Sequence, residues 1–273
     1  MDLPHILLAA AVGLGAGIVG GLAGIGGSIV IIPGLILVFG YRDEAHSEHH
    51  VYMAAAMCVN VLIGAVATRG HIAAGALRPA LFRGLIPGMV VGITVGVGVS
   101  NILHGQLLKE LLALFIAGYC LLNLFRAYRP RTDATRPPEH TGRGVLGGIG
   151  LVSGFSAGLL GLGGGVVMVP LLQVVANVRL RQAIAASAAV MIVSATVGAF
   201  LKLVTLSATS GHPASAALWY VPALAPGAML GGALGAWLAH RLPLAVVRVA
   251  VSVLLLIAAL RMSDVFAWVI DRF

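Results

Sequence analysis

The stretch GAGIVGGLAGIGGSIVIIPGL, residues 15–35, decides the fold of this chain. It lies inside an apolar run, 3–39, that is too long for one helical membrane crossing, because a helix needs about 20 residues to span the hydrocarbon core. Glycines cluster near the middle of the run. Glycine adopts backbone dihedrals that end a helix and lets other atoms approach closely. We therefore predict two shorter helices joined by non-helical backbone.

A second copy of this stretch, VSGFSAGLLGLGGGVVMVPLL, occupies residues 152–172 inside another long apolar run, 145–178. When Pro33 is placed on Pro170, the glycine clusters of the two stretches coincide. A further pair, PGMVVGITVG at 87–96 and PGAMLGGALG at 226–235, follows in the same order. The shared order of both pairs indicates an internal repeat.

The composition places most of the chain in lipid. The 273 residues are 59% hydrophobic and 10% charged, against about 25% charged in soluble domains. The net charge of +8 would suggest nucleic acid for a soluble protein, but basic residues in cytoplasmic loops explain it better here. Besides the two long runs, the apolar segments that we expect to cross the membrane are 51–68, 84–103, 107–125, 183–201, 216–239 and 244–260.

We predict an all-α polytopic membrane protein of two structural repeats, each with a glycine-broken first apolar segment followed by three transmembrane helices. The first repeat is 1–126, the basic linker 127–143 is cytoplasmic, and the second repeat is 144–273, within one integrated membrane domain of the bacterial inner membrane. Basic residues in cytoplasmic loops do not separate parallel from inverted repeats, because the two arrangements differ by only one in the number of Lys and Arg that they place in the cytoplasm. We prefer the inverted arrangement, in which each long run goes in and returns and both termini are periplasmic.

Two short features are interpreted as parts of the fold. The start, residues 1–17, resembles a signal peptide but carries Asp2 in place of a basic segment, and its glycine pattern recurs near residue 150. Cys58 and Cys120 each lie in an apolar run, and we expect core residues without a disulfide.

The glycine clusters are the candidate binding site. Broken helices survive at membrane depth when they are buried or line a cavity. Helices resume near Ser28 and Gly165, and their first N–H groups lack helical partners at the positive end of the dipole. Two such ends facing a midplane cavity would bind an anion. The expected substrate-binding backbone is that of Gly26, Gly27, Gly163, Gly164 and Gly165, and Ser28 would act as an N-cap or a direct ligand.

The motifs GIGGSIVIIPGL and GLGGGVVMVPLL resemble the paired signature of the TauE/SafE sulfite exporter family, also called the TSUP permeases. The resemblance covers nearly the whole chain. It implies transport of sulfite, sulfonates and other sulfur-containing anions. The family's next helix often carries Thr-Ser, eleven residues before a glycine; here Ala186–Ser187 and Tyr52–Met53 occupy these positions. The departure leaves room for a larger or less polar anion than sulfite.

Seven residues further along, Asn60 and Ser194 correspond to each other. We therefore add Asn60, Ser187 and Ser194 to the candidate substrate contacts. Asn60 has an equally weighted alternative, in which it only holds helices together.

Other candidates have plainer interpretations. The glycine faces Gly13/Gly17/Gly21, Gly20/Gly24 and Gly92/Gly96 are expected to pack helices. The loop histidines His46, His49 and His50, with Glu44 and Glu48, are expected to be solvated, with a pH-sensitive gate as the alternative. Lys202 is expected to end a span and to snorkel, with attraction of an anion as the alternative.

The sequence thus predicts a secondary transporter for a small anion, sulfite, a sulfonate or a sulfonated organic acid, bound near the midplane between the broken helices. No nucleophile–base pair is visible, so an enzyme is not expected, and neither is a cofactor, a metal or a nucleic-acid partner. The alternative function is a non-transporting membrane scaffold or accessory subunit. A homodimer is left open.

Overall fold

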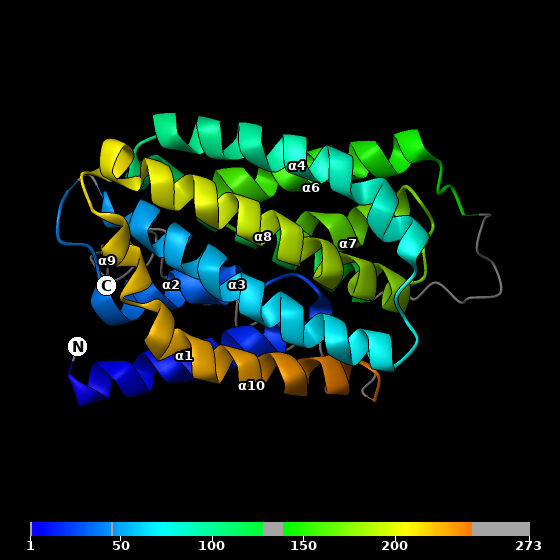
Figure 1. Ribbon diagram of the computed structural model, residues 1–273, viewed down its shortest axis with the longest axis horizontal. Helices are drawn as coiled ribbons and strands as arrows, with labels where there is room; N and C mark the ends of the chain where they lie inside the picture. Colours follow the sequence, from blue (N-terminus) through cyan, green and yellow to red (C-terminus); the bar gives the residue numbers. More distant parts are fainter. Residues whose placement is uncertain (1, 45, 128–138, 242–273) are drawn as a thin grey trace.

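The computed structural model of the chain describes residues 2–44, 46–127 and 139–241, and all regular structure within these ranges is helical (Figure 1). The helices, in chain order, are α1 (Leu3–Ala23), α2 (Ser28–Phe39), α3 (Glu48–Ala73), α4 (Pro79–Ile102), α5 (Gly105–Ala127), α6 (Arg143–Leu160), α7 (Gly165–Val174), α8 (Leu180–Ser210), α9 (Ala214–Leu218) and α10 (Val221–Ala239).

Six of these helices, α1, α3, α4, α6, α8 and α10, are long and apolar enough to cross a membrane. Helices α2 and α7 are apolar but short, with 12 and 10 residues. The prediction of an all-α polytopic membrane protein is confirmed. The expected span 244–260 and most of the linker 127–143 lie outside the described residues.

Each long apolar run is broken and turns back on itself. Gly24 ends α1 with a left-handed backbone, φ 65°, and α2 begins four residues later. The ring of His5, at the start of α1, stacks on Phe39, at the end of α2, with 5.6 Å between centroids. In the second repeat, the His140 N–H before α6 donates to the Ala176 carbonyl after α7, at 3.1 Å. Both runs therefore enter and return to the same end.

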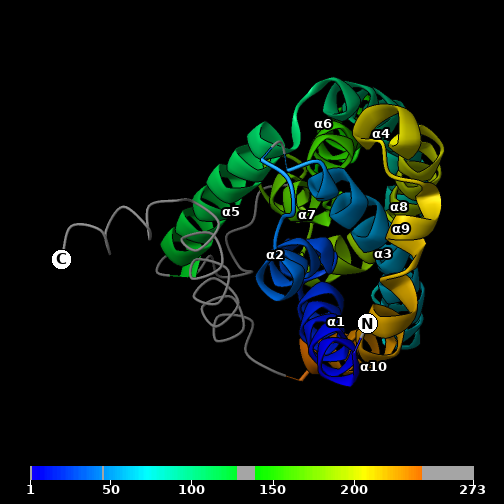
Figure 2. The same ribbon diagram turned by 90° about the vertical axis from the view of Figure 1, so that its left-hand side faces the viewer.

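The repeats are interlocked by two pairs of closely packed helices. Helix α1 packs along α10 and α4 packs along α6 (Figure 2). Glycine permits this approach, because a Cβ atom at Gly17 would lie 2.3 Å from the Ala228 carbonyl oxygen, and one at Gly92 would lie 2.2 Å from that of Leu151. The predicted packing role of the small-residue faces on α1 and α4 is confirmed.

Helices α3 and α8, which are equivalent in the repeat, pack against each other and run in opposite directions. His50, near the start of α3, bonds Lys202, late in α8, whereas Gly64, late in α3, lies against Ala188, early in α8. In Figure 2 these helices, with α2 and α7, lie between the α1/α10 pair and the α4/α6 pair, and α5 lies to one side. An antiparallel arrangement of equivalent helices is what inverted repeats require.

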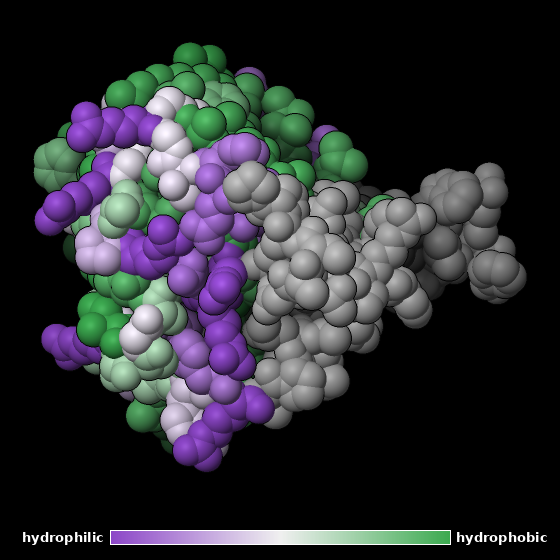
Figure 3. Space-filling model, turned by 90° about the vertical axis from the view of Figure 1, so that its right-hand side faces the viewer, coloured by the Kyte–Doolittle hydropathy of each residue, from purple (hydrophilic) through white to green (hydrophobic). Residues whose placement is uncertain are grey.

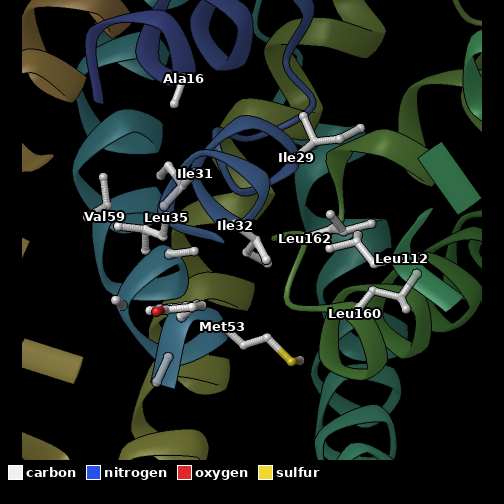
Figure 4. Packing of buried hydrophobic residues seen from close by; sticks show 14 of the residues in the cluster. Ala16, Ile29, Ile31, Ile32, Leu35, Met53, Val59, Leu112, Leu160 and Leu162 are labelled. Carbon is white, nitrogen blue, oxygen red and sulfur yellow. The ribbon is translucent and has the colours of Figure 1, made fainter. Parts of the chain in front are cut away.

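The largest buried apolar cluster surrounds α2 and joins both repeats. It combines Ile29 and Ile32 of α2 with Met53 of α3 and with Leu162, from the break between α6 and α7 (Figure 4). Apolar burial therefore holds the second repeat's break against the first repeat's short helix.

The two ends of the molecule differ in charge. At one end, Arg78 before α4 forms a salt bridge with Glu139 at 2.6 Å, and arginines flank the neighbouring helix ends. Hydrophilic side chains gather on this end (Figure 3). The opposite end carries the acidic and histidine-rich loop between α2 and α3.

Candidate functional site

The two glycine breaks adopt backbone conformations that other residues rarely reach. Gly24 and Gly26 have φ values of 65° and 84°, and their equivalents Gly161 and Gly163 have 74° and 72°. The next pair differs, since Gly164 has φ 91° and Gly27 has φ −84°. Backbone geometry therefore requires glycine at the five positions with positive φ and not at Gly27. The two breaks are similar but not identical.

The breaks touch each other. A Cβ atom at Gly165 would lie 2.1 Å from the Gly24 carbonyl oxygen, and one at Gly26 would lie 2.9 Å from that of Leu162. Both breaks lie beside the middle of α3 and α8, where Asn60 and Ser194 are found. The site is thus closed, with both repeats contributing backbone.

Asn60 is the side chain that joins the first break to the helices around it. Its Oδ1 accepts the Gly27 N–H at 2.7 Å, and its Nδ2 donates to Ser28 Oγ at 2.6 Å. The same Nδ2 would lie 2.7 Å from a Cβ atom at Gly163. Asn60 is fully buried, so these bonds replace those that water cannot make.

The two predicted serines on α8 bind carbonyl groups of the breaks. Ser187 Oγ donates to the Gly24 carbonyl at 2.7 Å, and Ser194 Oγ donates to the Gly163 carbonyl at 2.8 Å. Met53, which occupies the position equivalent to Ser187, packs its side chain against Gly161, the equivalent of Gly24. One repeat therefore closes this contact with a hydrogen bond and the other with an apolar side chain.

The structure brings all nine predicted site residues together, and substrate binding by them stays a prediction. The expectation that Ser28 acts as an N-cap was wrong, because Gly27 holds that position. The Gly27 N–H donates to the side-chain oxygen of Asn60, Oδ1. Gly24 ends α1 and belongs to the break, beyond the packing role expected for it. Tyr52 donates to the Gly40 carbonyl at 2.6 Å instead of facing the breaks.

Besides backbone carbonyls such as those of Gly26 and Leu162, the uncommitted polar groups at the breaks are hydrogen-bond donors. Ser28 accepts from Asn60, and no described residue accepts the Ser28 hydroxyl proton. Asn60 has a second amide hydrogen beyond the one that it gives to Ser28. The first backbone N–H groups of α2 and α7 point out of their helices. A cluster of donors at two helix N-termini favours negative charge.

Four polar side chains outside the breaks are buried, contrary to expectation: Glu48, His49, His50 and Lys202. His49 and His50 belong to the first turn of α3 and are 0% and 3% exposed. Lys202 lies inside α8, which continues to Ser210, and is 1% exposed. The apolar run 183–201 ends in the sequence at the charged Lys202, but the helix continues beyond it. His50 accepts a hydrogen bond from Lys202 Nζ at 3.0 Å.

Met191 is the site residue that sequence reasoning missed. A Cβ atom at Gly26 would lie 3.0 Å from Met191 Sδ, and one at Gly163 would lie 3.3 Å from its Cγ. Its position one helical turn before Ser194 was the available signal, because residues three apart share a helix face.

The loop between α2 and α3 is tied to its neighbours. The Tyr41 hydroxyl and His49 Nδ1 are 2.8 Å apart, and burial raises the pKa of the Tyr41 phenol well above its usual value. Tyr41 therefore stays protonated while it shares this hydrogen bond with His49. The prediction of a solvated loop was wrong for Glu48, His49 and His50, and it holds for Glu44, which is exposed.

A helical membrane protein with two broken helices meeting at its centre has the build of a secondary transporter. The comparisons agree: the chain matches the sulfite exporter TauE/SafE family over residues 9–262 and belongs to that family. It is a multi-pass membrane protein.

Two kinds of curated relatives are similar to the chain. It is 28% identical to the probable membrane transporter protein YunE of Bacillus subtilis over 243 residues, which covers 82% of this chain and 85% of YunE. It is 25% identical to the probable membrane transporter protein MamO of Magnetospirillum gryphiswaldense over 267 residues, 86% of this chain. The chain spans only 41% of the length of that MamO protein. No solved structure matches the chain significantly.

Proposed function

We propose that the protein carries a small anion, which binds between the two glycine breaks. The observation that carries the proposal is the kind of polar group found there: spare donors on Ser28 and Asn60, two helix N-termini, and no carboxylate among the predicted site residues. The spare side-chain donors and the two helix N-termini, with no carboxylate beside them among the predicted site residues, favour negative charge over positive charge.

The proposed substrate class is sulfite, a sulfonate or a sulfonated organic acid. The family's name supports a sulfur-containing anion. Met53 lies where the first repeat could have had a hydroxyl, so one side of the site offers a thioether instead of a donor. This asymmetry favours an anion with one polar end and one less polar end, such as an organosulfonate.

Movement is needed for a substrate to reach the breaks, because they are in contact and buried. In the proposed cycle the repeats are inverted, and one repeat rocks against the other around the breaks, opening them to alternate sides. The antiparallel run of α3 and α8 supports this arrangement. The arginine-rich end would be cytoplasmic and the loop between α2 and α3 periplasmic.

The test is flux into liposomes that contain the purified protein, with sulfite, taurine and isethionate as substrates. Wild type should carry at least one of them. Ser28→Ala removes the spare hydroxyl and leaves the Gly27–Asn60 bond, so it should lower flux about 10- to 100-fold, the usual effect of losing one hydrogen bond to a charged group. Ser153→Ala is the control, because Ser153 is a buried serine of α6 whose hydroxyl has no partner in the described chain.

A scaffold or accessory subunit is the second candidate function. Its support is that Asn60, Ser187 and Ser194 all hydrogen-bond within the breaks, as purely structural residues would. It predicts that bulky substitutions at Gly26 and Gly164 harm only folding. Folded wild type that carries no sulfur oxyanion in liposomes would rule out the carrier and leave the scaffold.

A further inference from the structure

Lys202 is a buried lysine that forms no ion pair with any residue that the structure describes. Lys202 Nζ donates to His50 Nδ1 at 3.0 Å and to Asn101 Oδ1 at 2.9 Å. Both partners are neutral acceptors, and a lysine ammonium has three N–H groups. The third has no acceptor among the described residues. An ammonium inside a membrane span is costly unless something compensates its charge.

The surrounding groups hold Lys202 in a donating arrangement. His50 Nε2 lies 3.2 Å from the Leu103 carbonyl oxygen, which can only accept, so Nε2 carries the ring proton and Nδ1 is the acceptor for Lys202. Asn101 Nδ2 donates to Thr205 Oγ1 at 3.0 Å, which turns the amide oxygen toward Lys202. The lysine is therefore positioned by α3, α4 and α8 together.

Among residues 2–44, 46–127 and 139–241, no carboxylate forms an ion pair with Lys202. Glu48, two residues before His50, accepts the backbone N–H of Arg42 at 3.1 Å. In the described part of the chain the single salt bridge is Arg78–Glu139, at the opposite end of the molecule. No described residue forms an ion pair with Lys202, and an anion bound beside it would supply the compensating charge.

The location of Lys202 relates it to the glycine breaks. It lies eight residues beyond Ser194 on α8, and His50 lies ten residues before Asn60 on α3, which correspond to about 12 and 15 Å along the helices. Between the two levels lies a small apolar cluster that includes Met57, Ile93 and Val97. The α3–α8 interface thus holds two polar levels separated by an apolar layer.

We propose that Lys202, held by His50 and Asn101, is a second anion-binding position, which the transported anion occupies between the glycine breaks and the end of the molecule that carries the α2–α3 loop. This rests on the proposed function, that the protein carries an anion. The apolar layer around Met57 separates the two positions, so the anion meets one set of donors at a time.

The decisive variant is Asn101→Asp. It keeps every heavy-atom position and places a carboxylate 2.9 Å from Lys202 Nζ, where it supplies a permanent counter-charge; the Thr205 hydroxyl can turn to donate to it. The protein should unfold at the same temperature as wild type or a higher one. Initial flux in liposomes, with sulfite, taurine and isethionate, should need about 30-fold more anion for half-saturation, the scale of effect seen when a buried charge loses its role in binding.

Lys202→Met should weaken flux similarly, and Lys202→Arg should restore part of it, because arginine keeps the charge. Arg83→Met, which removes an exposed charge at the other end, is the control and should match wild type. If wild type carries one of these anions and Asn101→Asp has wild-type half-saturation, or is less stable than wild type, the second position is refuted and the carrier remains. If wild type carries none, both proposals fail.

Discussion

Asn60→Asp tests the proposed anion site without removing the contacts that hold the break. Aspartate keeps the oxygen that accepts the Gly27 N–H at 2.7 Å. The new oxygen replaces Nδ2, which lies 2.6 Å from Ser28 Oγ, and the uncommitted Ser28 proton can turn to donate to it. The hydrogen-bond count is preserved while the site gains a negative charge.

The expected effect on binding follows from Coulomb's law. Two like charges about 4 Å apart repel by about 4 kcal/mol at an effective dielectric constant of about 20, and by about 2 kcal/mol at twice that distance. These energies weaken binding of a monoanion by roughly 1000-fold and 30-fold. Transport should return as the pH is lowered enough to protonate the carboxylate, since the charge then disappears.

The assay compares anion flux in liposomes and thermal unfolding in detergent for wild type, Asn60→Asp and Gln182→Glu. The control makes the same amide-to-acid change beside Arg78, which already bonds Gln182 at 3.3 Å. Both variants should fold, and Asn60→Asp should lose flux whereas Gln182→Glu should keep wild-type flux. Folded Asn60→Asp with wild-type flux at neutral pH would refute an anion site at the breaks.

Two further predictions concern stability. Gly165→Ala should destabilise the protein by about 1–3 kcal/mol, because its Cβ atom would meet the Gly24 carbonyl oxygen at 2.1 Å. The control Gly98→Ala, with nothing within 4 Å of the added Cβ atom, should be neutral or stabilising by up to about 1 kcal/mol. Equal unfolding temperatures for the two variants would contradict this packing. The pKa of His240 is lowered by partial burial and by Arg181, so its contribution to stability is present above the unfolded-state pKa of about 6.5 and is lost as the pH falls below it. The unfolding temperature of wild type should therefore drop more than that of His240→Gln between pH 7.5 and pH 5, and parallel drops would show that His240 does not contribute.

The sequence was sufficient for the features that repeat. The glycine-broken runs and the small-residue faces could be predicted because periodicity and glycine spacing are local properties of a chain. The alignment of Asn60 with Ser194, and of Met53 with Ser187, also placed four side chains at equivalent levels of α3 and α8. The structure adds that each contacts a break.

The sequence was insufficient for the features that depend on several helices at once. Lys202 was interpreted as the end of a span because its partners His50 and Asn101 lie more than 100 residues away along the chain. The loop histidines were expected in water because no pattern near them indicates that Tyr41 and Leu103 would cover them. Burial of a polar side chain is a tertiary property, and propensity or hydropathy windows do not contain it.

The pairing of α1 with α10 and of α4 with α6 has a consequence for biogenesis. Helices α1 and α4 of the first repeat pack most extensively against α10 and α6 of the second repeat. While the first half is newly synthesised, the glycine face of α1 lies against lipid, and it is covered only when α10, more than 200 residues later, emerges from the ribosome. Assembly must therefore finish after insertion. Two halves of the gene expressed as separate chains should find each other in the bilayer, whereas either half alone should be left for quality-control proteases.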